Sequence, residues 1–314
     1  MQAPILTLTL NPALDMATAV PNLLPGHKLR CSDPHLDPGG GGLNVSRAIK
    51  ALGGDSLALV ALGGLTGDRL AGLIRAEGVT FLSILGPGET RQSLTVTEGS
   101  SGKQYRFMLP GPIWGAAERA RVFTLLSATA RPGGYSVISG SQPPGVPADF
   151  PAQLAASMEG SLVVLDTSGA ALFEAVRHPI PGLEVLRMDG EEGEELAGRP
   201  LPTLTDTADF ASELVARGVA KRVIVARGAE GNVLADAQHR IFAKAAKVKV
   251  KSTVGAGDSF VAAFVLALSR GQSNDEALAL GSAAASAAVM SDATQLCRPE
   301  DVQRLLPECA VSRV

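Results

Sequence analysis

Residues 38–62 read PGGGGLNVSRAIKALGGDSLALVAL, and this stretch sets the kind of fold to expect. After the glycines, apolar side chains recur at helical spacing over residues 44–52, and Gly53-Gly54 follows as a helix stop. Residues 56–62 then read as a strand, because the apolar run that follows Ser56 is typical of a buried strand. The stretch therefore predicts a glycine-rich turn at the amino end of a helix that leads into a sheet.

The same alternation of strand and helix continues along most of the chain. Further strand patterns cover residues 5–10, 135–139, 162–166, 223–226, 233–235 and 248–250. Further helical patterns cover residues 68–77, 147–158, 257–270 and 274–290. Because parallel neighbouring strands need crossover connections and helices supply them, we expect an α/β fold with a mainly parallel sheet covered on both faces.

Two stretches break this alternation. Residues 28–36 read as a strand, and residues 93–109 read as two strands that flank the turn-prone Gly99-Ser-Ser-Gly102. We predict that they belong to a small extra sheet, inserted from about residues 16–37 and 93–109. The whole chain, residues 1–314, is then expected to form a single domain.

Composition excludes several classes of function. The chain has 314 residues and a formal net charge of -3, which provides no basic field for binding nucleic acid. No apolar run reaches the roughly 18 residues of a membrane helix, and no basic segment precedes an apolar core at the amino terminus. The three cysteines and four histidines show no metal-ligand spacing. We therefore expect a cytoplasmic protein with no membrane, nucleic-acid or zinc partner.

The stretch Ser252-Thr-Val-Gly-Ala-Gly-Asp-Ser259 is the strongest chemical signal in the sequence. It predicts a glycine-rich turn before the helix that begins near Gly257, and free N–H groups at a helix start stabilise the charge of a phosphoryl group. Asp258 would lie in the first turn, where a carboxylate can take a proton from an attacking hydroxyl. The alternative is an ordinary strand-to-helix turn with an acidic residue.

The glycine run at residues 39–42 predicts close contact between the backbone and a ligand, since four glycines cost conformational entropy; a flexible loop is the alternative. Asn44 supplies an amide suited to sugar hydroxyls. Asp15 follows the first strand and could bind hydroxyls, or could form a turn after Asn11-Pro12.

Other nucleotide-binding motifs are absent from the sequence. It contains no G-x-x-x-x-G-K-[ST], and neither glycine cluster fits G-x-G-x-x-G with an acidic residue about 20 positions later. A P-loop is excluded, and a dinucleotide-dependent dehydrogenase is disfavoured.

With these motifs in place, the sequence resembles the PfkB/ribokinase family of carbohydrate kinases over essentially its whole length. The blocks that carry the resemblance are Thr7–Asp15, Pro38–Ile49, Ser139–Gly145, Asp166–Gly169 and Ser252–Asp258. Within the family, Lys28-Leu-Arg-Cys31 and Gln104-Tyr-Arg-Phe107 are similar to the minor, PfkB-type bacterial 6-phosphofructokinases. The resemblance implies a ribokinase-like, three-layer α/β/α fold with a small β-sheet lid.

The resemblance also implies an activity, namely ATP- and Mg²⁺-dependent phosphorylation of fructose 6-phosphate to fructose 1,6-bisphosphate. Asp258 would be the base, and Gly255, Ala256 and Gly257 would form the anion hole. The sugar would be bound by Asp15, Gly40, Gly41, Asn44 and Ser139. Lys28 and Arg91 would meet the phosphate already on the sugar, where a guanidinium suits bidentate contact. The lid would close over the sugar, and a homodimer would form through it.

The nucleotide side departs from the family pattern. Where relatives have Lys-Pro-Asn-x-x-Glu, residues 187–192 read Arg-Met-Asp-Gly-Glu-Glu, so Arg187 and Asp189 would face the nucleotide. The added carboxylate of Asp189 would recruit Mg²⁺ or weaken ATP binding. Glu192 is the candidate Mg²⁺ ligand, with Glu191 as a rival and Asp166 behind it. A solvated helix start is the alternative for this acidic stretch.

Two further segments depart from the pattern. In the nucleotide loop Ala226-Arg-Gly-Ala-Glu-Gly231, Ala226, Gly228 and Gly231 would line the nucleotide, and a hydroxyl contact is missing at Ala226. Ser291-Asp-Ala-Thr294 replaces Asn-x-Gly-Thr near the family's monovalent-cation loop, which argues against a requirement for K⁺.

Alternatives remain open at this point. A 1-phosphofructokinase or a tagatose-6-phosphate kinase would change only the sugar. A protein that binds sugar phosphates with impaired phosphoryl transfer is the alternative from another class, suggested by the departures at Asp189, Ala226 and Ala293.

Overall fold

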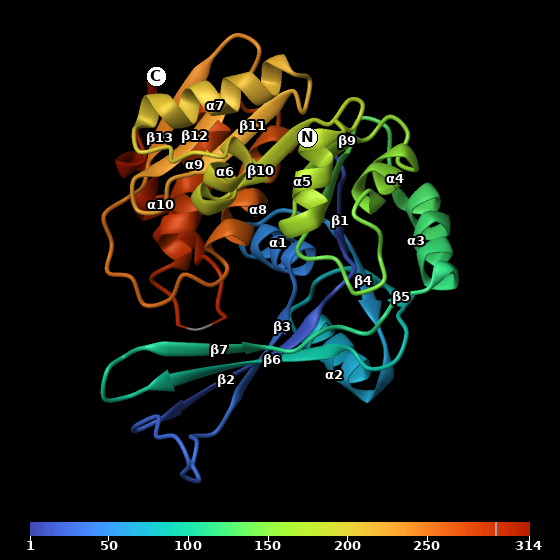
Figure 1. Cartoon of the computed structure of the whole chain (residues 1–314), viewed down its shortest axis with the longest axis vertical. Helices are drawn as coiled ribbons and strands as arrows, with labels where there is room; N and C mark the ends of the chain where they lie inside the picture. The colour runs from blue at the N-terminus through green and yellow to red at the C-terminus, as the bar shows by residue number, and fades with distance from the viewer. Residues whose placement is uncertain (293) are drawn as a thin grey trace.

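The computed structural model describes residues 1–292 and 294–314, and within these ranges the chain forms a large sheet, a small separate sheet and the helices around them (Figure 1). The large sheet and most of its helices fill the upper part of the view, and the strands of the small sheet lie in the lower part. This arrangement confirms the predicted α/β fold with a mainly parallel sheet and a small extra sheet.

The large sheet has seven neighbouring parallel strands, followed at one edge by three antiparallel strands, within the described part of the chain. The parallel strands, in spatial order, are β5 (Phe81–Leu85), β4 (Leu57–Leu62), β1 (Ile5–Thr9), β8 (Tyr135–Ser139), β9 (Leu162–Asp166), β10 (Val185–Met188) and β11 (Arg222–Ala226). The antiparallel strands are β12 (Gly231–Ala235), β13 (Arg240–Lys244) and β14 (Val311–Arg313).

Helices cover both faces of the large sheet because successive side chains of a strand point to opposite sides. On β8, Val137 packs into the apolar cluster of one face and Ile138 into that of the other. The first face carries α1 (Gly41–Ala51), α2 (Gly64–Ala76), α8 (Ala256–Ser269), α9 (Asn274–Ala288), α10 (Pro299–Leu305) and the 3₁₀ turn η1 (Leu306–Glu308). The second face carries α3 (Ala116–Thr129), α4 (Phe150–Ala156), α5 (Gly169–Arg177), α6 (Gly190–Ala197) and α7 (Leu204–Ala216).

Helix α8 lies in the middle of the first face and is buried from Ser259 to Ser269. Its neighbour α9 is rich in alanine and has one glycine, Gly281, so the two helices approach closely: a Cβ at Gly281 would lie 2.8 Å from the ring of Phe260. This packing holds the start of α8 in a fixed place at the edge of the sheet.

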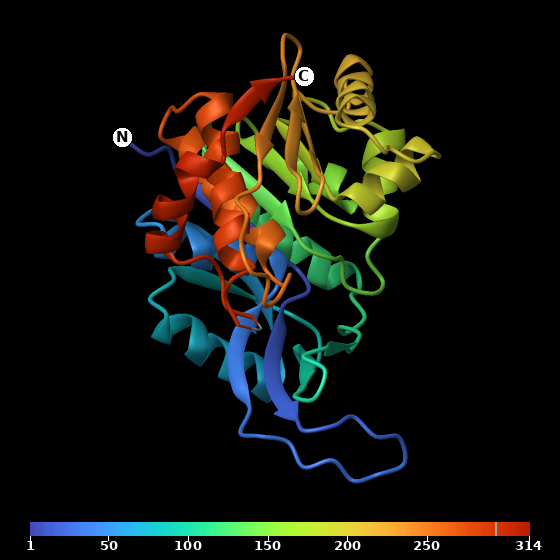
Figure 2. The same cartoon turned by 90° about the vertical axis from the view of Figure 1, so that its left-hand side faces the viewer.

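The small sheet has the strand order β3 (His35–Gly39), β2 (Ala13–Val20), β6 (Arg91–Glu98) and β7 (Gln104–Met108). Residues 21–34, which connect β2 to β3, form a long loop that projects beyond the sheet (Figure 2). The strand predicted over residues 28–36 therefore begins only at His35. The preceding residues have no strand partner in the described chain and stay in the loop.

The strand predicted at residues 248–250 is wrong, and β13 was missed. Strand β13 forms a hairpin with β12 through a tight turn in which the N–H of Asp236 donates to the carbonyl of His239 (2.9 Å). After β13 the chain leaves the sheet to reach the start of α8, and Val250 is 56% exposed. Local apolar pattern alone could not decide which of the two segments would find a pairing partner.

The remaining predicted strands and helices are present with shifts of a few residues at their ends. The shift that matters most for the candidate site is at α1, which begins at Gly41, inside the glycine run. None of the helices in the described ranges is long and apolar enough to cross a membrane. The expected cytoplasmic location stays a prediction.

Gly42→Ala is expected to lower the free energy of unfolding by about 1–3 kcal/mol, because a Cβ at Gly42 would lie 2.4 Å from the carbonyl oxygen of Leu8 on β1. Gly72→Ala is the matched control: Gly72 is an exposed glycine within α2, and a Cβ on it would meet no atom within 4 Å, so alanine should be neutral or stabilise by up to about 1 kcal/mol. Urea denaturation of both variants measures the difference, and equal effects would contradict the close packing of α1.

Candidate active site

The candidate site lies at the carboxyl edge of the large sheet, where α1 and α8 begin. Ser139 and Asp166 are the last residues of β8 and β9, and Arg187 lies in β10 beside them. Open parallel sheets bind ligands at this edge, because strand ends and helix starts meet there. The structure thus brings together residues from five separate parts of the chain.

Asp258 lies in the first turn of α8, partly exposed, and is held by Asn44 from the first turn of α1. The Nδ2 of Asn44 donates to Oδ2 of Asp258 over 2.8 Å. Burial and the nearby carboxylate of Asp166 raise the pKa of Asp258 to about 6, although the Asn44 hydrogen bond and Arg187 act in the opposite direction. A carboxylate with this pKa can accept a proton near neutral pH.

Arg187 links the sheet edge to the start of α8. Its Nη1 donates to Oδ1 of Asp166 (3.2 Å), and the other oxygen of Asp166 accepts from the hydroxyl of Ser139 (2.9 Å). Burial lowers the pKa of Arg187, but the carboxylates of Asp166, Asp258 and Glu192 outweigh it, so the pKa is raised overall. Arg187 is therefore a permanent cation between three carboxylates, and its buried Nε has no partner in the described chain.

Arg187 packs directly against the backbone of the glycine turn at residues 255–257. A Cβ at Gly257 would lie 3.1 Å from both terminal nitrogens of Arg187. Gly255 caps the helix in the left-handed region (φ 74°), and a Cβ there would lie 2.7 Å from Leu296. In the described chain no side chain caps the start of α8, and the first helical bond runs from the N–H of Ser259 to the carbonyl of Gly255 (2.9 Å), so the N–H groups of residues 256–258 are available for an anion.

Asp15 lies within β2, opposite Asp37 on β3 and Ser93 on β6. The alternative that Asp15 is a turn residue is therefore wrong. The hydroxyl of Ser93 donates to Asp15, and burial raises the pKa of this carboxyl against the opposing effects of Ser93, Arg91 and Arg47. The small sheet thus presents a partly buried carboxyl group that can bind a hydroxyl.

The glycine run is packed, so the flexible-loop alternative is also wrong. A Cβ at Gly39 would lie 2.0 Å from the carboxylate of Asp15, and one at Gly41 would lie 2.5 Å from the hydroxyl of Ser139. Gly40 has φ 120°, which other residues rarely adopt. Protein contacts alone therefore require these glycines, and ligand contact at Gly40 and Gly41 stays a prediction.

Arg91 and Lys28 occupy opposite ends of the small sheet. Arg91 begins β6 opposite Ala13, its Nε donates to the carbonyl of Asn11 (3.2 Å), and its side chain makes no other hydrogen bond in the described chain. Burial lowers its pKa while Asp15 raises it, and the net shift is downward. Lys28 is exposed in the projecting loop beyond the other end of β2 (Figure 2). The structure does not bring the two cations together within one chain.

Asp189 is the N-cap of α6. Its Oδ1 accepts from the N–H of Glu192 (2.9 Å), and Oε2 of Glu192 accepts from the N–H of Asp189 (2.9 Å), which forms a capping box. The acidic stretch therefore forms a helix start, as the alternative interpretation predicted. Burial raises the pKa of Glu192, and Arg187 and Asp166 both act on it electrostatically, whereas Glu191 is exposed. Of the two rivals, Glu192 is the one that lies near the site.

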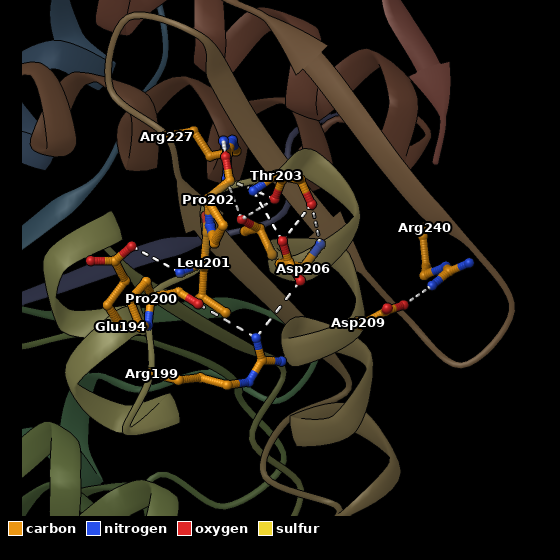
Figure 3. A network of polar contacts seen from close by, with 11 residues as sticks. Glu194, Arg199, Pro200, Leu201, Pro202, Thr203, Asp206, Asp209, Arg227 and Arg240 are labelled. Carbon is orange, nitrogen blue, oxygen red and sulfur yellow. Dashed lines mark hydrogen bonds and ion pairs between the residues drawn. The ribbon is translucent and has the colours of Figure 1, made fainter.

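Arg227, which sequence reasoning did not single out, binds the loop between α6 and α7 (Figure 3). It follows Ala226 at the end of β11, is 9% exposed, and donates to the carbonyls of Leu201, Pro202 and Thr203 at 3.0–3.1 Å. No local pattern marks an arginine that will brace a distant loop. This loop connects α6 to α7, so Arg227 ties the loop that follows α6 to the end of β11.

Gly228 and Gly231, the two glycines predicted to line the nucleotide, differ in how closely their surroundings pack. Gly231 has φ 142°, and a Cβ there would lie 2.1 Å from the carbonyl of Ala243, so strand pairing needs this glycine. Gly228 is exposed with φ 54°, and no atom lies within 4 Å of a Cβ built on it.

A sequence profile of the pfkB family carbohydrate kinases matches residues 10–301. The chain belongs to this family. It is 41% identical over 304 residues to ATP-dependent 6-phosphofructokinase isozyme 2 of Mycobacterium tuberculosis, covering 96% of this chain and 88% of that protein. The corresponding isozyme of Escherichia coli is 40% identical over 306 residues, covering 96% and 97%. A 1-phosphofructokinase of Xanthomonas campestris is 33% identical over 313 residues, covering 98% and 95%.

Solved structures agree with this membership. Phosphofructokinase-2 from Escherichia coli, in complex with substrates and products, superposes with a TM-score of 0.92 at 39% identity, covering 98% of this chain and 99% of that one. Structures of the same protein with potassium and in a tetrameric inhibited form give TM-scores of 0.92 and 0.91. A ribokinase from Arabidopsis thaliana (TM-score 0.72, 20% identity) shares the fold, which is therefore ribokinase-like.

The donor set of this pfkB family kinase fits Mg²⁺. The described residues contain no group of three or more His, Cys, Asp or Glu side chains that could hold a metal alone. Mg²⁺ in kinases is commonly held by one or two carboxylates together with substrate phosphates, and Glu192, with Asp166 behind it, provides a hard oxygen donor. A preformed protein cage is therefore not required.

The segment near the family's cation loop is tied to the small sheet. The hydroxyl of Thr294 donates to the buried carboxylate of Asp37, and that of Ser291 donates to the carbonyl of Leu296 (3.2 Å). Ala293, which carries the predicted departure, lies outside the described residues. The expectation about K⁺ stays a prediction.

Asp258→Asn is expected to stabilise the fold at pH 7 by about 1–3 kcal/mol, because the folded-state pKa of about 6 exceeds the ordinary value of 3.8. A raised carboxyl pKa means that folding takes up a proton between about pH 4 and pH 6, so stability is lost as pH rises through that window.

Denaturation without nucleotide or Mg²⁺, at about pH 4.5 and about pH 7, measures this effect at the two ends of that window. Asp33→Asn, at an exposed loop position, is the control and should change stability little at either pH. A stabilisation by Asp258→Asn that is absent at pH 7, or larger at the acidic pH, would contradict the raised pKa.

Proposed function

We propose that this pfkB family kinase transfers the γ-phosphoryl group of ATP to fructose 6-phosphate and produces fructose 1,6-bisphosphate. One observation carries the proposal: the Asp258 carboxylate, with a pKa raised to about 6, lies in the first turn of α8 beside uncapped N–H groups and Arg187. The two relatives of about 40% identity named above support the choice of sugar.

The chemical step assigns one role to each group. Asp258 takes the proton of the sugar's primary hydroxyl as that oxygen bonds to the γ-phosphorus, and the bond from this phosphorus to the bridging oxygen breaks to release ADP. The N–H groups of Gly255, Ala256 and Gly257, with the Arg187 cation behind them, oppose the negative charge on the transferred group. Phosphoryl transfer depends mainly on such positioning and electrostatic stabilisation.

On the sugar side, the hydroxyls would be bound by Asp15, Gly40, Gly41, Asn44 and Ser139. Arg91 has donors left to bind the phosphate already present on the substrate, because only its Nε has a partner in the described chain. Lys28 would reach a phosphate only if the projecting loop moves or belongs to another copy, since it lies at the far end of the small sheet.

On the nucleotide side, Ala226, Gly228, Gly231, Arg187 and Asp189 would line the ATP site, with Asp189 contributing through its cap of α6. Glu192, with Asp166 behind it, would hold Mg²⁺, which neutralises charge on the phosphates when it is bound. The departure at residues 291–294 disfavours activation by K⁺ without excluding it, and a solved structure of the E. coli relative contains the ion.

The substrate assignment is tested by coupled ADP release with ATP and Mg²⁺ on fructose 6-phosphate, fructose 1-phosphate, tagatose 6-phosphate, fructose and ribose. We expect fructose 6-phosphate to have the highest kcat/KM, and Asp258→Asn to lose about 10²–10⁴ in kcat with sugar binding retained, because an amide cannot accept the proton. Near-normal turnover of this variant would reject Asp258 as the base.

Other outcomes of the panel select the alternatives. A preference for fructose 1-phosphate would place the chain with the 33% identical 1-phosphofructokinase, and a preference for tagatose 6-phosphate would change only the sugar. Folded protein that binds a sugar phosphate without turnover of ATP would indicate the sugar-phosphate-binding alternative.

We further propose that the small sheet is a lid and that it forms the interface of a homodimer. Phe107 and Met108 on its edge strand β7 are 47% and 52% exposed, as is expected of apolar residues that a partner covers. The tetrameric inhibited form of the E. coli relative makes a higher assembly the main alternative.

Phe107→Asp is expected to convert a dimer into a monomer in sedimentation equilibrium, because a charge would be buried at the interface. Leu85→Asp is the matched control, since Leu85 is 65% exposed on β5 at the edge of the large sheet, and it should stay dimeric. A monomeric unmodified protein at micromolar concentration, or a dimer that survives Phe107→Asp, would contradict the interface.

A further inference from the structure

Arg47 of α1 is almost fully enclosed and uses its whole guanidinium group. Its side chain is 8% exposed. Nε and Nη2 donate to the two carboxylate oxygens of Glu77, at the end of α2, over 2.6 and 2.8 Å. Nη1 donates to the carbonyl of Pro38 (2.7 Å) and to Oδ1 of Asn44 (3.1 Å). Arg47 therefore connects α2, β3 and the start of α1.

The contact with Asn44 fixes the orientation of an amide that touches the proposed base. Oδ1 of Asn44 accepts from Arg47 while Nδ2 donates to Asp258. A guanidinium can only donate and a carboxylate can only accept, so a flipped Asn44 would place two donors together and two acceptors together. Arg47 thus selects the rotamer in which Asn44 donates to Asp258.

The same arginine also holds a strand of the small sheet. Pro38 belongs to β3 and pairs with Leu14, next to Asp15 on β2. Asp37, also on β3, has its Oδ1 3.6 Å from Nη2 of Arg47. Nη1 of Arg47 donates to both Pro38 and Asn44. A displacement of β3 relative to α1 would therefore break this pair of hydrogen bonds.

We propose that Arg47 is a positioning residue that orients Asn44 toward Asp258 and makes this orientation depend on the position of strand β3. The inference rests on the proposed role of Asp258 as the base. Arg47 touches neither the sugar nor the nucleotide in this assignment, and it acts through Asn44.

The test is a double-mutant cycle on kcat with Arg47→Met, Asn44→Ala and the double variant. Arg47→Met is expected to lower kcat about 10- to 100-fold, because a base displaced by about 1 Å loses such a factor. In the Asn44→Ala background the same substitution should change kcat less than about twofold, because the residue through which Arg47 acts is gone. Arg270→Met is the matched control: Arg270 donates to the carbonyl of Gly53 just after α1 (2.9 Å), and it should leave kcat unchanged.

A second readout separates positioning from simple loss of folded protein. The Asn44 hydrogen bond lowers the pKa of Asp258, so Arg47→Met should shift the acidic limb of the kcat profile to higher pH. The other charged groups that act on Asp258, namely Asp166, Arg187 and Asp15, are unchanged in this variant. A smaller amount of folded enzyme would lower kcat at every pH without moving the limb.

If Arg47→Met does not fold, Arg47→Lys serves in its place, because an ammonium keeps the charge but cannot make the planar fork to Glu77 and Asn44 together. Effects of Arg47 and Asn44 that multiply in the double variant, or an unmoved pH profile, would overturn the inference. If Asp258→Asn itself keeps normal turnover, the base assignment fails, and this result is distinguishable because it does not involve Arg47.

Discussion

The start of α1 lies closer to the large sheet than a side chain would allow, and the rest of the site depends on this approach. At Gly41 and Gly42, a Cβ would lie 2.5 Å from Ser139 and 2.4 Å from the carbonyl of Leu8. Because glycine removes that obstacle, Asn44 in the first turn of α1 reaches Asp258 in the first turn of α8, 214 residues later. Two helix starts, each rich in free N–H groups, thereby share one edge of the sheet.

The charged groups at that edge of the sheet act on one another in opposite directions. Asp166 and burial oppose ionisation of Asp258, while Arg187 and the Asn44 amide favour it, and a pKa of about 6 results. Arg187 in turn stays charged because three carboxylates surround it. The cluster therefore combines a carboxylate that can accept a proton near neutral pH with a cation beside a helix start, a combination suited to phosphoryl transfer.

The departures from the family pattern at Asp189 and Ala226 lie in segments with clear structural roles. Asp189 replaces the family's Asn and caps α6 through a reciprocal pair with Glu192, so its carboxylate satisfies a backbone N–H. Arg227 follows the alanine that replaces a hydroxyl residue, and it binds three consecutive carbonyls of the loop before α7. Both departures thus lie where neighbouring side chains bind backbone groups.

The sequence by itself determined the alternating α/β architecture and the small extra sheet, and it singled out Asn44, Asp258 and the two glycine stretches that the structure brings together, because these features depend on local periodicity and turn chemistry. Only the tertiary structure decided that residues 240–244, and not 248–250, join the sheet, and that Arg47 and Arg227 brace the site. Strand pairing and side-chain bracing are chosen by partners distant in the chain, and a local pattern carries no information about which partner will be within reach.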